Sequence, residues 1–182
     1  MANTMKKKIS IPVSFAMLWI LSKALLFTFN FESQEKIGVY INLFLIMIVI
    51  FASLHDKVKK EKKLENYASN FKTSLKNAGI YIIIVTLYVF IHHKFVNPGY
   101  LKDKEMTMVE AELAKDFEAI KKNNISFQYQ NKEGWEKQVR SSAKLFTSVT
   151  LNTSIYFLGL FFMSLLYSII VPIFYKKVVL RV

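Results

Sequence analysis

Four long apolar stretches, separated by polar segments, dominate the chain. They cover about residues 11–30, 37–54, 78–95 and 149–175. A membrane-spanning helix needs roughly 20 mostly apolar residues to cross a hydrocarbon core of about 30 Å. The pattern therefore predicts an all-α membrane protein with four transmembrane helices, in which residues 1–182 form a single polytopic domain. The first stretch follows the basic segment MKKKIS but has no small-residue cleavage site, so we expect an uncleaved helix.

The polar segments differ strongly in charge. The N-terminal segment, the second connection and the C-terminal segment together hold thirteen basic and three acidic residues, a net charge of +10. The first and third connections, with Lys94, hold eleven basic and ten acidic residues, a net charge of +1. Because basic residues concentrate in cytoplasmic segments, we expect both termini inside and residues 96–148 outside. Basic residues that flank apolar spans also argue against a nucleic-acid-binding protein.

The second connection carries apolar residues at helical spacing among its lysines. Leu64, Tyr67, Phe71 and Leu75 recur every three or four residues. This spacing predicts a cytoplasmic amphipathic helix on the inner leaflet, with the lysines between Lys57 and Lys76 facing anionic headgroups. The alternative is a basic flank that only fixes the topology.

The third connection, about residues 96–148, is the one large polar segment. Asn97-Pro98-Gly99 predicts a helix stop, and residues 103–122 predict one amphipathic helix. The candidate packing face of that helix consists of Met106, Val109, Leu113, Phe117 and Ile120. Residues 125–130 alternate as a short strand would, and a second helix is expected at about 133–146. We expect an extracytoplasmic helical hairpin that caps the bundle.

Lys23 is the most unusual residue of the apolar stretches, because it lies near the middle of the first one. A charged side chain at the bilayer centre costs at least about 2.5–3.5 kcal/mol on insertion scales. Our prediction is that Lys23 snorkels toward the outer headgroups. The alternatives are an ion pair with an acidic residue of another subunit, since no Asp or Glu lies inside the four stretches, or a place along a transport pathway.

The sequence suggests no catalytic, cofactor-binding or metal-binding residues. It has no cysteine, no glycine-rich phosphate-binding loop and no nucleophile motif. His92 and His93 are adjacent, so on a helix they point about 100° apart and do not form the i, i+4 pair of a metal site. We interpret them as part of a polar collar with Tyr88 and Tyr100 at the membrane boundary. An enzyme is therefore not expected.

The stretch from Asn66 to Leu101 resembles a family of small four-span bacterial inner-membrane proteins known as domain of unknown function 4199. An apolar span with a late tyrosine is followed by a short Phe-Val-Asn-Pro turn and an acidic outer helix that contains methionine. The matching positions are Tyr88, Phe95, Val96, Asn97, Pro98, Tyr100 and Leu101. Lys23 and the few glycines of the first two spans depart from the pattern. The resemblance implies a Gram-negative inner membrane and the same topology, but no activity.

These observations favour a non-enzymatic subunit of a membrane protein complex over a catalyst. The expected partners are the lipid bilayer and other membrane proteins or further copies of the chain. Four spans without visible internal symmetry give weak support to a transporter of the inverted-repeat type. The alternative function is a small oligomeric transporter or channel-like protein that uses Lys23.

Overall fold

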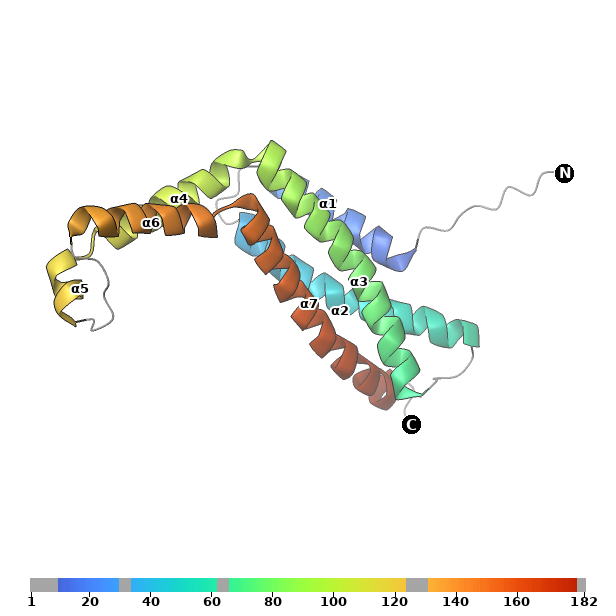
Figure 1. The fold of residues 1–182 in the computed structure, drawn as a ribbon. Helices are drawn as coiled ribbons and strands as arrows, with labels where there is room; N and C mark the ends of the chain where they lie inside the picture. Colours follow the sequence, from blue (N-terminus) through green and yellow to red (C-terminus); the bar gives the residue numbers. More distant parts are fainter. Residues whose placement is uncertain (1–9, 30–33, 62–65, 124–130, 180–182) are drawn as a thin grey trace. The chain divides into compact units, whose positions relative to one another are not determined.

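The computed structural model describes residues 10–29, 34–61, 66–123 and 131–179, and these residues are almost entirely helical (Figure 1). The helical elements in chain order are α1 (Ile11–Thr28), α2 (Gln34–Glu61), α3 (Tyr67–Ile91), the π-helical turn η1 (His92–Val96), α4 (Pro98–Leu113), α5 (Phe117–Asn123), α6 (Lys132–Phe146), α7 (Val149–Phe174) and the π-helical turn η2 (Tyr175–Val179). Within these ranges there is no strand. The predicted all-α fold is confirmed.

Four helical segments are long and apolar enough to cross a membrane. They cover Ile11–Thr28, Glu35–Glu61, Tyr67–Val96 and Val149–Val178. Each contains one of the predicted stretches almost completely, and two extend well beyond them. The helix α2 continues past the apolar stretch to Glu61, and α3 begins at Tyr67, well before residue 78. Adding a residue to an existing helix is much easier than nucleating a new one, so the helices run on through their polar flanks.

The amphipathic helix expected in the second connection is therefore divided between two long helices. Its first residues belong to the end of α2 and its last residues to the start of α3, while residues 62–65 lie outside the described ranges. Asn66 caps α3, since its side-chain oxygen accepts a hydrogen bond from the Ser69 backbone N–H at 2.9 Å. The described lysines of this connection thus extend from the end of α2 and the start of α3.

The chain divides into two compact units. The first unit comprises Met1–Tyr88 and Tyr156–Val182, and the second comprises Val89–Ile155. In the first unit, α1 packs against α2, where the Trp19 indole donates a hydrogen bond to the Gly38 carbonyl at 2.9 Å. Its core is formed by fully buried apolar side chains, among them Ile46, Val49, Ile50, Leu54, Ile82 and Val85.

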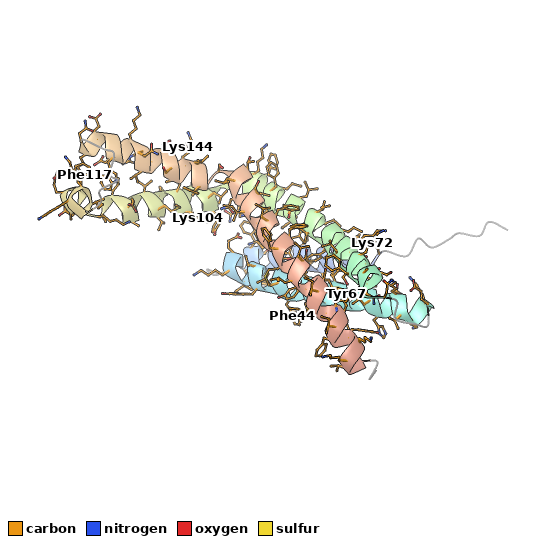
Figure 2. All side chains as sticks on the ribbon, turned by 60° about the horizontal axis from the view of Figure 1, so that its bottom comes forward. Phe44, Tyr67, Lys72, Lys104, Phe117 and Lys144 are labelled. Atoms are coloured by element: carbon orange, nitrogen blue, oxygen red, sulfur yellow. The ribbon has the colours of Figure 1, made fainter. Side chains whose placement is uncertain are left out.

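The second unit is a helical hairpin in which α4 and α6 lie side by side (Figures 1 and 2). Asn97 caps α4 by accepting a hydrogen bond from the Tyr100 backbone N–H at 3.3 Å, and Pro98 occupies the first helical position. The expectation of one helix over residues 103–122 is wrong. The helix breaks after Leu113, because the Asp116 carboxylate caps α5 by accepting a hydrogen bond from the Glu118 N–H at 3.0 Å. The strand predicted at 125–130 lies outside the described residues.

Candidate functional site: buried polar groups of the bundle

Lys23 is buried in the first unit and forms an ion pair within the chain. Its side chain is 3% exposed, and its Nζ lies 2.7 Å from Oε1 of Glu35 in the first turn of α2. The predicted snorkelling is therefore wrong. The alternative was an ion pair with an acid of another subunit, but the acid belongs to this chain, because α2 begins at Gln34 and carries Glu35 to the level of Lys23. A carboxylate at this distance forms a charge-assisted hydrogen bond with the ammonium.

The residues one turn away from the ion pair shape the space around it. Trp19, one turn before Lys23, donates to the backbone of α2 and packs edge to face on Tyr88, with ring centroids 5.7 Å apart. Gly38, one turn after Glu35, lies under the lysine stem, where an added Cβ would be 3.5 Å from the Lys23 Cδ. A methyl group would fit there, but a longer side chain would enter the space of the lysine. The lysine stem and the Trp19 indole therefore both lie against Gly38.

The ion pair has a clear physical consequence. Opposite charges in contact remove most of the field that a single ammonium would produce inside the bilayer, and this lowers the cost of placing Lys23 in a span. Glu35 is 21% exposed, so the carboxylate keeps some access to its surroundings. The contact joins α1 to α2, and both charges are used in it.

A second polar contact connects three spans through one amide. The side chain of Asn42, fully buried on α2, accepts a hydrogen bond from the Tyr81 hydroxyl of α3 and donates one to the Tyr156 hydroxyl of α7. Sequence reasoning did not nominate these residues. An asparagine inside an apolar stretch is a usable indication of an interhelical hydrogen bond, since a buried amide in a membrane needs partners.

The opposite end of α2 makes a further contact with the C-terminal helical segment. Nδ1 of His55 lies 3.0 Å from the Tyr175 hydroxyl, and the Phe51 and Tyr175 rings pack at 5.3 Å between centroids. The helix α2 therefore contacts α1 through Gly38, α3 and α7 through Asn42, and η2 through His55. It is the central helix of the first unit.

The two adjacent histidines lie in the second unit. His92 and His93 are buried in η1, and the His93 ring stacks on Tyr100 with centroids 5.4 Å apart. The described ranges contain no group of three or more His, Asp or Glu side chains that could hold a metal ion. His93 and Tyr100 are thus in contact, while the polar collar at the membrane boundary stays a prediction.

The predicted packing face of the cap is only partly covered. Val109 and Phe117 are buried, and Leu113 and Ile120 are partly buried, but Met106 is 56% exposed. The Phe117 ring packs on Trp135 of α6, with centroids 5.6 Å apart. Figure 2 shows Phe117 at the far end of the hairpin, beyond Lys104 of α4. The predicted face is divided between two helices, because α4 ends at Leu113 and Phe117 begins α5.

The turn on which the family resemblance rests forms the start of helix α4. Asn97 is the cap of α4, Pro98 is its first residue and Tyr100 supplies the capped N–H, while Phe95 is 67% exposed. No family model, curated protein or solved structure matches this chain. The resemblance therefore stays a prediction.

Proposed function

We propose that this chain is a non-enzymatic integral membrane protein that serves as an accessory or structural subunit of a membrane protein complex. The observation that carries the proposal is that polar groups inside the bundle bind one another between helices. Lys23 and Glu35 pair with each other, and Asn42 binds two tyrosine hydroxyls. These groups hold helices together, which is the usual task of polar residues between transmembrane helices.

The outer faces of the spans support the proposal. Only 22% of the 18 residues of α1 are buried inside the protein, compared with 44% of an 18-residue apolar segment of α2. Large apolar side chains project from the spans, among them Leu21, Leu25, Phe44, Leu87 and Phe162 (Figure 2 labels Phe44). In a bilayer such faces pack against lipid or against other transmembrane helices, and close packing between helices is a main source of their association.

The proposed location is the inner membrane of a Gram-negative bacterium, with both termini in the cytoplasm. The charge difference of +10 against +1 supports this orientation. The lysines from Lys57 to Lys76 would then lie beside the anionic headgroups of the inner leaflet, where each contributes roughly 1 kcal/mol of attraction. The family resemblance of the Phe95 to Tyr100 turn supports the choice of membrane.

The test is gentle detergent extraction of the tagged chain, followed by native mass spectrometry and by flux measurements in proteoliposomes. We expect the chain in a stoichiometric assembly with another membrane protein, and no flux from the chain alone. The matched variant is Lys23→Met combined with Glu35→Gln, which removes both charges together. A lone oligomer whose flux is altered in this variant would overturn the proposal in favour of a transporter that uses Lys23.

A further inference from the structure

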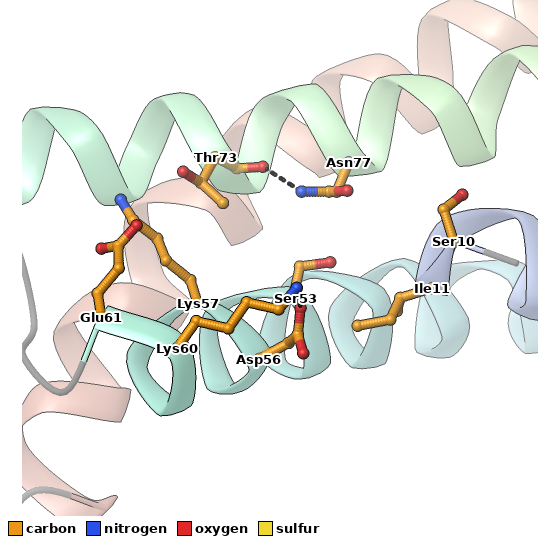
Figure 3. Close-up of a pocket in the computed structure, with 9 residues that line it drawn as sticks. All are labelled: Ser10, Ile11, Ser53, Asp56, Lys57, Lys60, Glu61, Thr73 and Asn77. Carbon is orange, nitrogen blue, oxygen red and sulfur yellow. Dashed lines mark hydrogen bonds and ion pairs between the residues drawn. The ribbon is translucent and has the colours of Figure 1, made fainter. Parts of the chain in front are cut away.

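A polar cleft of about 530 Å³ lies in the first unit, at the end where the lysine-rich segments begin (Figure 3). Its walls are the start of α1, the end of α2 and the first half of α3. Cavities of about 300–1,000 Å³ are the size that binds small organic groups. The cleft is lined mainly by polar side chains, in contrast to the apolar core beside it.

The cleft lies where the polar and apolar parts of three helices meet. On α1 it is bordered by Ser10 and Ile11, at the first residue of the apolar stretch. On α2 it begins at Ser53, where the apolar stretch ends, and on α3 it includes Asn77, the last residue before that stretch begins. Three boundaries at one level mark the interface between hydrocarbon and headgroups. A group bound there is at the depth of a lipid headgroup.

The α2 wall presents charges of both signs. Lys57 and Lys60 supply two ammonium groups, and Asp56 and Glu61 supply two carboxylates. Lys60 lies 2.5 Å from Asp56, and Lys57 donates a hydrogen bond to the Ser69 hydroxyl at 2.7 Å. A purely anionic group would meet repulsion from the two carboxylates. A group that carries both a phosphate and an amine complements both signs.

Ser53 adds an unused hydrogen-bonding group to this wall. Its side chain is 6% exposed, and its hydroxyl has no hydrogen-bond partner among the described residues. Figure 3 shows it on the side of α2 that faces α3, where the Asn77 amide donates to the Thr73 carbonyl at 2.9 Å. A buried hydroxyl without a partner is unfavourable, so a bound phosphate oxygen that accepts its proton would satisfy it.

We propose that this cleft binds a zwitterionic phosphodiester headgroup, that of an amine-bearing phospholipid such as phosphatidylethanolamine. The phosphate is recognised by Lys57, Lys60 and Ser53, and the amine by the Asp56 and Glu61 carboxylates. The depth of the cleft allows the acyl chains to continue into the bilayer beside Ile11. This site is independent of the accessory function proposed above.

The test is a lipid titration of the purified full chain in detergent, read by native mass spectrometry. The probes are phosphatidylethanolamine, phosphatidylglycerol and soluble glycerophosphoethanolamine. We expect saturable binding of phosphatidylethanolamine in preference to phosphatidylglycerol. Lys60→Gln should weaken it about tenfold, as expected for a lost charged hydrogen bond. Lys59→Gln removes the same charge from an exposed neighbour that does not line the cleft and should leave binding unchanged.

Ser53→Ala gives an independent variant that leaves all charges in place. We expect severalfold weaker binding, whereas Ser74→Ala, which removes another buried hydroxyl without a described partner, should bind as the wild type does. Equal binding of the two lipids, or equal binding by each variant and its control, would overturn the proposal. Millimolar glycerophosphoethanolamine that displaces the lipid would support recognition of a free phosphodiester, and its failure to compete would support a membrane-anchored ligand.

Discussion

Replacing Lys23 by methionine tests the ion pair between α1 and α2. Methionine keeps the apolar stem, so the main loss is the ammonium opposite Glu35 at 2.7 Å. Removing one partner of a buried pair typically costs about 3–5 kcal/mol. Glu35 is 21% exposed and lies in the first turn of α2, where the helix dipole contributes about 0.3–1 kcal/mol to a carboxylate. We therefore expect Lys23→Met to lower the free energy of unfolding by about 2–3 kcal/mol.

The reciprocal change should cost more. Glu35→Gln leaves the ammonium of Lys23, which is only 3% exposed, without its carboxylate. The double variant removes both charges and should lie within about 1 kcal/mol of the wild type, since neutral replacements of a buried pair are often tolerated. Lys36→Met, at an exposed neighbouring position, is the control and should have little effect.

The assay is unfolding in mixed micelles by increasing SDS, followed by far-UV circular dichroism and tryptophan fluorescence. The tryptophan signal combines Trp19, which lies one turn from Lys23, with Trp135 of α6. The wild type, the two single variants at Lys23 and Glu35, and the double variant form a double-mutant cycle. Its coupling energy measures the strength of the ion pair. Additive effects of the two single variants, or a neutral Lys23→Met, would refute the pairing and restore the snorkelling interpretation.

Three further predictions concern topology, the cap and the core. In intact cells an impermeant maleimide should label Ser141→Cys but not Lys72→Cys, both exposed positions; labelling of Lys72→Cys alone would invert the proposed orientation. Phe117→Asp should destabilise the cap by about 2–4 kcal/mol in limited proteolysis or thermal unfolding, because it buries a charge against α6, whereas Ala119→Asp on the exposed side of α5 should be tolerated. Asn42→Leu should lower the free energy of unfolding by about 1–3 kcal/mol, because it leaves two tyrosine hydroxyls without their amide, and an unchanged SDS midpoint would contradict the assigned network.

The spans could be predicted because length and apolarity are properties of each segment alone. The partner of Lys23 could not be predicted in this way, because Glu35 lies just outside the apolar stretch that begins near residue 37. Hydropathy averaged along the chain assigns Glu35 to the connecting loop. The structure shows that α2 starts before its apolar residues do. A search for acidic residues within one turn of each predicted span would have found this pair.

Contacts between helices were beyond the reach of local patterns. Asn42 is visible as a polar residue in an apolar stretch, but its partners Tyr81 and Tyr156 lie 39 and 114 residues away. The break between α4 and α5 was missed for a different reason. The apolar spacing continues across residues 114–116, while the Asp116 side chain competes for the backbone and ends the periodic helix.

The central position of α2 has a consequence for the synthesis of the chain. Asn42 is synthesised before either of its partners, because Tyr81 and Tyr156 follow it by 39 and 114 residues. At about 5–20 residues per second, roughly 2–8 seconds pass before Tyr81 is made and roughly 6–23 seconds before Tyr156 is made. Until Tyr156 is made, the Asn42 amide lacks the second of its two hydrogen-bond partners. The nascent first half of the protein is therefore open to pairing with polar groups of other membrane helices until α7 emerges.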